Sequence, residues 1–77
     1  MRTAVFKSYK KGYYTFWFEN GEELVFEEVH PRVLKQYDLK NDKSYIDQEF
    51  KITFVEDFED DDEEISIYRI ESLKPIQ

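Results

Sequence analysis

Residues 10–26 of the chain read KKGYYTFWFENGEELVF, and this stretch decides how the fold is interpreted. Five aromatic rings fall within six positions, and an Asn-Gly pair separates them from a second apolar run. Asn-Gly is the strongest short signal for a β-hairpin, because both residues tolerate the positive φ angles of a type I′ turn. We therefore expect strands over 13–19 and 22–28, joined by a two-residue turn at Asn20 and Gly21.

A two-residue turn fixes which side chains share a face of this hairpin. In that register Trp17 lies opposite Leu24, and Thr15 lies opposite Phe26. No charge interrupts the centre of this face, so we assign it to the core. The opposite face is apolar in the middle and acidic at its rim, and it is the candidate ligand surface. Its members are Tyr14, Phe16, Phe18 and Val25, edged by Glu23 and Glu27.

The remaining elements follow from the hydrophobic pattern. Residues 3–9 are rich in β-branched and aromatic types and predict a first strand. Residues 48–55 alternate between apolar and polar types, which is typical of a half-buried strand. Residues 64–73 predict the last strand, and a slip in its apolar parity indicates a bulge near Tyr68.

Between the third and fourth strands the pattern changes to that of a short helix over 30–40. Val33, Leu34 and Tyr37 share one side of a helix at this spacing. Pro31 suits the first helical turn, where its missing N–H has no role. The predicted order of elements is therefore strand, strand, strand, helix, strand, strand.

This order resembles that of the oligonucleotide/oligosaccharide-binding (OB) fold, a five-stranded, partly open Greek-key barrel. The resemblance covers nearly the whole chain, residues 1–77, at the level of architecture. An SH3-like barrel is the structural alternative, and the helix between strands three and four favours the OB arrangement. A chain of 77 residues predicts a single domain of this mainly β class.

The charge of the chain is unevenly distributed. Net charge is −7; residues 1–44 carry 8 Lys/Arg and 7 Asp/Glu, whereas residues 45–77 carry 3 and 11. Much of the excess lies in the acidic loop predicted at 56–64, EDFEDDDEE. A net-acidic surface repels phosphate backbones, which disfavours general nucleic-acid binding.

The sequence lacks the residues that several functional classes require. The chain has no cysteine, one histidine (His30) and only two glycines, Gly12 and Gly21, so thiolate metal sites and Gly-rich phosphate loops are excluded. No serine has an identifiable base. The acidic run does not match an EF-hand, whose sixth and twelfth positions require Gly and Glu. We expect no enzyme, no metal and no cofactor.

The hydropathy of the sequence predicts a soluble protein. No run approaches the roughly 20 apolar residues of a membrane span, and the first ten residues do not resemble a signal peptide. A soluble, cytoplasmic protein with no membrane association is expected. Its predicted state is a monomer, and dimerisation through an edge strand is left open.

The OB resemblance implies where a ligand would lie. Ligands of that fold cross strands two and three, between the loop that joins strands one and two and the loop that joins strands four and five. The first loop here holds Lys10 and Lys11, and the second is the acidic run. The predicted partner-binding residues of that run are Asp57, Asp60, Asp61, Asp62 and Glu63.

These features predict a small non-catalytic binding module for a basic protein segment. The alternative is single-stranded nucleic acid, whose bases would stack on Tyr14, Phe16 and Phe18 while Lys10 and Lys11 contact phosphates. A third interpretation is that the three rings form a second small core. Their exposure in the folded chain distinguishes a platform from a core.

Overall fold

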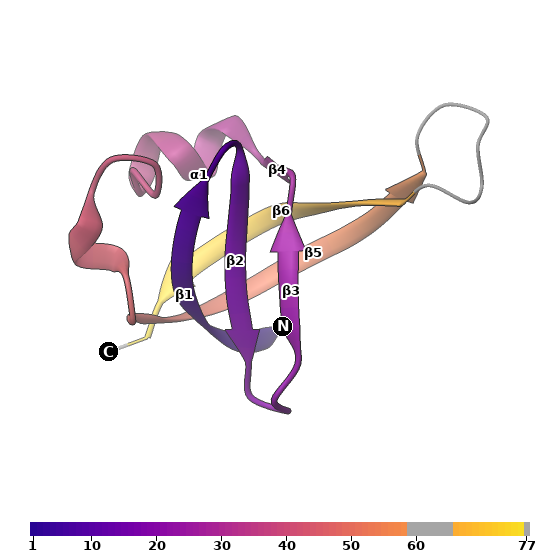
Figure 1. The fold of residues 1–77 in the computed structure, drawn as a ribbon, viewed down its shortest axis with the longest axis horizontal. Helices are drawn as coiled ribbons and strands as arrows, with labels where there is room; N and C mark the ends of the chain where they lie inside the picture. Colours follow the sequence, from indigo (N-terminus) through magenta and orange to yellow (C-terminus); the bar gives the residue numbers. More distant parts are fainter. Residues whose placement is uncertain (59–65, 77) are drawn as a thin grey trace.

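The chain folds mainly into β-strands, and the computed structural model describes residues 1–58 and 66–76 (Figure 1). One sheet of six strands is accompanied by one short α-helix and one 3₁₀ turn. The elements are β1 (Arg2–Lys10), β2 (Tyr13–Phe18), β3 (Glu23–Phe26), β4 (Glu28–Val29), α1 (Pro31–Gln36), η1 (Lys43–Tyr45), β5 (Glu49–Phe58) and β6 (Ser66–Pro75). The mainly β class is confirmed, and the third predicted strand is divided into β3 and β4.

The strands are ordered β3-β2-β1-β5-β6-β4 in the sheet. Antiparallel pairing joins β1 to both β2 and β5, and it also joins β2 to β3 and β5 to β6. The last pair, β4 with β6, is parallel. Only Glu27 separates β3 from β4, the two strands at opposite ends of this order. No ladder among the described strands closes the sheet, so the expected five-stranded barrel is not confirmed.

The hairpin of β2 and β3 has a different register from the predicted one. Phe16 lies opposite Leu24, and Trp17 lies opposite Glu23. The Phe18 N–H donates to the Glu22 carbonyl at 2.8 Å, which leaves a three-residue loop over 19–21. The predicted two-residue type I′ turn is therefore wrong.

The angle φ at Gly21 is +85°, whereas Asn20 does not have a positive φ. A three-residue hairpin loop needs a left-handed residue only at its last position, which is where Gly21 lies. The additional loop residue moves β2 by one position against β3. Because side chains alternate along a strand, Tyr14, Phe16 and Phe18 now lie on the inner face with Phe26.

The other hairpin, between β1 and β2, has the type I′ geometry instead. Lys10 pairs with Tyr13, and the two residues between them have φ values of 52° (Lys11) and 89° (Gly12). Positive φ at both central positions gives the backbone twist that a two-residue hairpin requires. Gly12 takes this conformation without a steric penalty, whereas Lys11 is held there by the flanking strands.

The core is built from aromatic rings of β1, β2, β3 and β5. The ring of Phe16 is fully buried and lies 5.2 Å from Phe6 and 5.7 Å from Phe26 between centroids. Such tilted and edge-to-face pairs are the favoured aromatic arrangements. The predicted core face of β2 is wrong, because Trp17 is 51% exposed. Among the described side chains, the buried residues of the core are Ala4, Phe6, Tyr14, Phe16, Phe18, Phe26, Val29, Val33, Leu39, Phe50, Ile52, Ile70 and Leu73.

Helix α1 agrees with its prediction at its start and is shorter at its end. Pro31 is the first helical residue, and the Nδ1 of His30 caps the helix by accepting a hydrogen bond from the Arg32 N–H at 3.1 Å. Val33 is buried, and Leu34 packs against the core. The helix ends at Gln36 rather than near residue 40, because Tyr37 has an extended backbone (φ −133°, ψ 106°).

Strands β5 and β6 form a long ribbon that extends past the other strands (Figure 1). Thr53 pairs with Ser72 and Phe54 pairs with Ile70, so Glu71 is the extra residue of a bulge. The bulge is thus three residues later than the predicted site near Tyr68. The first part of the predicted acidic loop, residues 56–58, belongs to β5; residues 59–64 lie outside the described part of the chain.

Candidate functional site

The outer face of β1, β2 and β3 is the surface on which exposed apolar side chains gather. Trp17 lies between Val5 of β1 and Glu23 of β3, and Thr15 lies opposite Val25. Trp17 is 51% exposed and Val25 is 41% exposed. These residues face outward because the alternate residues of the same strands fill the core. We define the outer face as Val5, Tyr13, Thr15, Trp17 and Val25.

Trp17 is held by polar contacts on both neighbouring strands. Its indole N–H donates to Glu23 Oε2 at 2.6 Å, and the amine of Lys7 lies 4.6 Å from the ring centroid. The same amine donates to Asp47 Oδ1 at 2.6 Å. Lys7 is the extra residue of a bulge in β1, between the pairs made by Phe6 and Ser8. A cation above the indole face stabilises this arrangement by about 0.5–1 kcal/mol at an exposed site.

A hollow of about 220 Å³ lies beside Trp17, at the end of the outer face near the β2–β3 loop. Two carboxylates line it, from Glu19 and Glu49, and no basic side chain does. Glu19 is fixed by the Thr3 N–H, which donates to its Oε2 at 2.9 Å. The remaining lining is formed by Thr3, Ala4, Val5, Trp17 and Phe18. Its chemistry suits an amine or guanidinium carried on an apolar stem.

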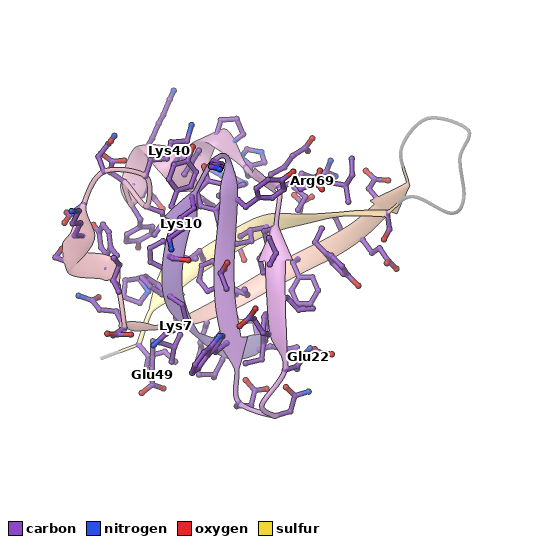
Figure 2. All side chains as sticks on the ribbon, in the orientation of Figure 1. Lys7, Lys10, Glu22, Lys40, Glu49 and Arg69 are labelled. Atoms are coloured by element: carbon purple, nitrogen blue, oxygen red, sulfur yellow. The ribbon has the colours of Figure 1, made fainter. Side chains whose placement is uncertain are left out.

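Basic side chains near this hollow are already paired. Arg2 lies 3.7 Å from Glu19 and 3.6 Å from Glu22, and its guanidinium is 4.5 Å from the Phe18 ring centroid. Figure 2 labels Lys7 and Lys10 on β1, with Glu22 at the β2–β3 loop and Glu49 at the start of β5. The cation beside Trp17, the Lys7 amine, therefore already forms an ion pair with Asp47.

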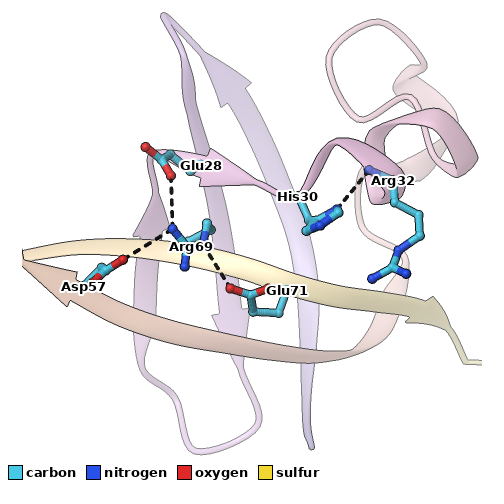
Figure 3. A network of polar contacts seen from close by, with 6 residues as sticks. All are labelled: Glu28, His30, Arg32, Asp57, Arg69 and Glu71. Atoms are coloured by element: carbon cyan, nitrogen blue, oxygen red, sulfur yellow. Dashed lines mark hydrogen bonds and ion pairs between the residues drawn. The ribbon is translucent and has the colours of Figure 1, made fainter.

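A second, larger hollow of about 520 Å³ lies between β4, α1 and β6. Arg69 forms part of its wall and contacts three carboxylates: Glu71 at 2.9 Å, Asp57 at 3.3 Å and Glu28 at 3.7 Å (Figure 3). The hydrogen bond that Arg69 Nε donates to Glu71 Oε1, supported by the nearby carboxylates, raises the pKa of the Arg69 guanidinium. These groups neutralise one another in part, so this hollow is a weaker candidate for a charged ligand.

Two tyrosine hydroxyls also have altered acidity. Burial is the main cause that raises the pKa of Tyr14, and this keeps the hydroxyl neutral in the core. The carboxylate of Glu56 is the main cause that raises the pKa of Tyr68, its partner across the β5–β6 ladder. Both shifts favour the neutral phenol over the nucleophilic phenolate.

The structure buries three of the six predicted ligand residues and exposes the other three. Tyr14, Phe16 and Phe18 are 3%, 0% and 4% exposed, so their faces are not accessible for stacking. The prediction that they form an exposed platform is wrong, because the three-residue β2–β3 loop places their side chains in the core. Val25 is exposed on the outer face, beside Thr15 and not beside the three rings with which it was predicted to lie, and Lys10 and Lys11 are exposed at the β1–β2 turn.

The predicted acidic partner-binding residues are only partly described. Asp57 lies in β5 and pairs with Arg69. The others, Asp60, Asp61, Asp62 and Glu63, lie outside the described residues. The sequence did not place Tyr13, Trp17 or Glu49 among the predicted ligand residues. The useful signal was the Lys11-Gly12 pair, because a two-residue turn there aligns Tyr13 with charged Lys10 and so turns 13, 15 and 17 outward.

Other kinds of site lack support in the described ranges. Within residues 1–58 and 66–76, no three His, Asp or Glu side chains are grouped so that they could hold a metal ion. None of the helices described there is long and apolar enough to cross a bilayer. The nitrogen of His30 that could act as a base is occupied by the helix cap.

Comparison of the chain with protein-family models, curated proteins and solved structures finds no match. Function is therefore inferred from the residues of the outer face and their geometry.

Proposed function

We propose that the chain is a small non-catalytic binding module that holds a segment of another protein on its outer face. The observation that carries the proposal is the half-exposed Trp17 beside a hollow walled by Glu19 and Glu49. An apolar side chain of the partner contacts Trp17 and Val25, and a neighbouring Lys or Arg enters the hollow. Aromatic anchors of this kind dominate the energetics of protein interfaces.

Charge favours a protein ligand over nucleic acid at this face. Arg2 and Lys7 are paired with Glu19, Glu22 and Asp47, so few cations are available for phosphates. The Lys7 amine also covers one side of the Trp17 ring, where a base would stack. A basic segment instead meets the carboxylates of Glu49 and Glu19, of which Glu19 is shared with Arg2 at 3.7 Å, and complementary charge raises its association rate.

At the level of architecture, we interpret the sheet as a distorted barrel of the OB type. In this interpretation β3 and β4 act as one strand interrupted at Glu27. Support comes from two hydrogen bonds to β6: the Glu27 N–H donates to the Tyr68 carbonyl at 3.2 Å, and the His30 N–H donates to the Ile70 carbonyl at 2.9 Å. The outer face of β2 and β3 then corresponds to the ligand face of OB domains.

Fluorescence of Trp17, which is the only tryptophan in the chain, tests the proposal directly. The probe is the peptide acetyl-Leu-Lys-Leu-Arg-Leu-amide, compared with acetyl-Leu-Glu-Leu-Asp-Leu-amide. We expect the basic peptide to shift the emission in a saturable way and the acidic peptide to leave it unchanged. Equal responses to both peptides, or no response at millimolar peptide, would contradict the proposal.

A matched pair of variants locates the site. Glu49→Gln removes one carboxylate from the hollow and is expected to weaken the basic peptide about threefold to fivefold, in line with a surface ion pair. Glu27→Gln removes the same charge outside the hollow and should leave the affinity unchanged. If the two variants weaken the peptide equally, the interaction depends on net charge rather than on this site.

Single-stranded nucleic acid is the second candidate. It is favoured by Tyr13, 47% exposed, on the same side of β2 as Trp17 and beside Lys10 and Lys11. Titration of an oligothymidine of about 12 nucleotides at roughly 50 and 200 mM salt distinguishes the two candidates, because phosphate contacts weaken steeply with salt. Quenching of Trp17 at the lower salt, lost at the higher salt, would favour this candidate over a protein segment.

A further inference from the structure

The strand β5 has one edge that is only partly used by the rest of the sheet. Its first part, residues 49–52, pairs with β1. Residues 53–57 pair with β6, and among residues 1–58 and 66–76 no backbone group bonds to their other side. We define residues 53–57 as the β5 edge. It lies on the ribbon that extends past the other strands (Figure 1).

We infer that the β5 edge binds an extended basic segment of a partner protein by strand addition. An exposed edge presents unpaired N–H and C=O groups that a peptide strand can use, and alternate side chains then provide selectivity. This surface is separate from the outer face of β1 to β3, so the inference goes beyond the proposed function and does not depend on it.

The residues of the edge suit pairing. Its sequence, TFVED, has neither proline nor lysine, two residues that natural edges commonly use to prevent strand addition. Val55 is 40% exposed, and Phe54 packs inward against Phe18 and Phe26 at 5.5 and 5.2 Å between ring centroids. The inward ring anchors the strand, so the edge is held extended before any partner arrives.

Charge determines the kind of partner. Glu56 and Asp57 are exposed at the end of the edge. Arg69 is shared among Asp57, Glu28 and Glu71, so one guanidinium offsets three carboxylates and a negative excess remains beside the strand. A segment with Lys or Arg opposite positions 56 and 57 complements this excess.

The same charge disfavours a second copy of the chain. Antiparallel pairing of two β5 edges gathers four carboxylates, from Glu56 and Asp57 of each chain, along one pair of strands. Like charges on adjacent strands are destabilising. The edge is therefore protected from self-association by acidic groups, and the same groups select a basic partner.

The test uses a peptide designed for an antiparallel register, acetyl-Lys-Lys-Val-Thr-Val-Thr-amide, and NMR of the labelled chain. At saturating peptide, we expect amide protons at alternate positions of residues 53–57 to exchange at least about tenfold more slowly. Residues 50–52 already have strands on both sides and provide the internal control. Two other peptides serve as controls: one with Glu-Glu in place of Lys-Lys, and the basic peptide N-methylated at alternate residues.

Strand addition predicts that only the unmethylated basic peptide protects the edge. Binding of the methylated peptide with equal affinity would overturn the inference, because charge alone would then explain it. No binding up to about 5 mM, or protection outside residues 53–57, would also overturn it. Protection of the edge in concentrated chain without peptide would assign it to a second copy instead.

A pair of charge reversals completes the test. Glu56→Lys is expected to weaken the peptide about fivefold or more, which corresponds to losing one ion pair and gaining one repulsion. Glu27→Lys makes the same change at an exposed position between β3 and β4, outside residues 53–57 and outside the hollow beside Trp17, and should have little effect. Because Trp17 fluorescence reports on the outer face and amide exchange reports on the β5 edge, failure of one proposal is distinguishable from failure of the other.

Discussion

At the scale of single residues, the aromatic side chains of β2 serve two different purposes. Phe16 is fully buried and contacts rings of three other strands, at 5.2 Å (Phe6), 5.7 Å (Phe26) and 6.4 Å (Phe50) between centroids. Its sequence neighbour Trp17 is half-exposed and contacts Lys7 and Glu23. Adjacent rings in one strand therefore differ in whether they contribute to stability or remain available for binding.

This difference predicts truncation effects of unequal size. Phe16→Ala leaves a cavity among packed rings and should lower the free energy of unfolding by about 3–5 kcal/mol. Trp17→Ala removes a surface contact and should lower it by about 1 kcal/mol or less. Urea unfolding followed by far-UV circular dichroism measures both. Equal losses would show that the inner and outer faces of β2 are wrongly assigned.

At the scale of elements, turn length decides what the sequence could and could not predict. The mainly β class, the helix that begins at Pro31 and the inward side of Phe26 follow from local patterns, and they are correct, whereas the third predicted strand is divided into β3 and β4. The β2–β3 register is not local, because Asn20-Gly21 suits both a two-residue loop and the last two positions of a three-residue loop. Burial of Phe16 and Phe18 against β5 selects the longer loop, and the candidate site changed with it.

The β1–β2 turn offers a stability test at this scale. Lys11 has a φ of 52°, which asparagine adopts more readily than lysine. Lys11→Asn should therefore raise the free energy of unfolding by about 0.5 kcal/mol. The control is Asn20→Ala, which removes the hydrogen bond that the Glu22 N–H donates to Asn20 Oδ1 at 3.0 Å and should lower stability. Destabilisation by Lys11→Asn would contradict the turn geometry.

At the scale of the whole molecule, the net charge of −7 destabilises the folded state through repulsion among acidic side chains. A domain this small buries a modest fraction of its surface, so its stability is limited. Arg69 reduces this repulsion where three acidic side chains of β4, β5 and β6 meet. Its contribution is electrostatic and partly exposed to solvent, so dissolved salt can replace some of it.

Salt dependence tests that contribution. In about 20 mM salt, Arg69→Gln should lower the free energy of unfolding, and in about 500 mM salt the loss should shrink. Arg32→Gln makes the same charge change on α1, away from the three carboxylates, and serves as the control. An equal loss at both salt concentrations would mean that Arg69 acts through packing rather than charge.

The ring contacts of Phe26 have a consequence for synthesis on the ribosome. Phe26 lies within 5.2 Å of Phe54 and 6.1 Å of Tyr68, both of which are translated much later. Until then the β1–β2–β3 meander has no cover for its inner rings, and a partly made chain presents them to solvent. We therefore expect stable folding of this meander to follow the synthesis of β5 and β6, which complete its core.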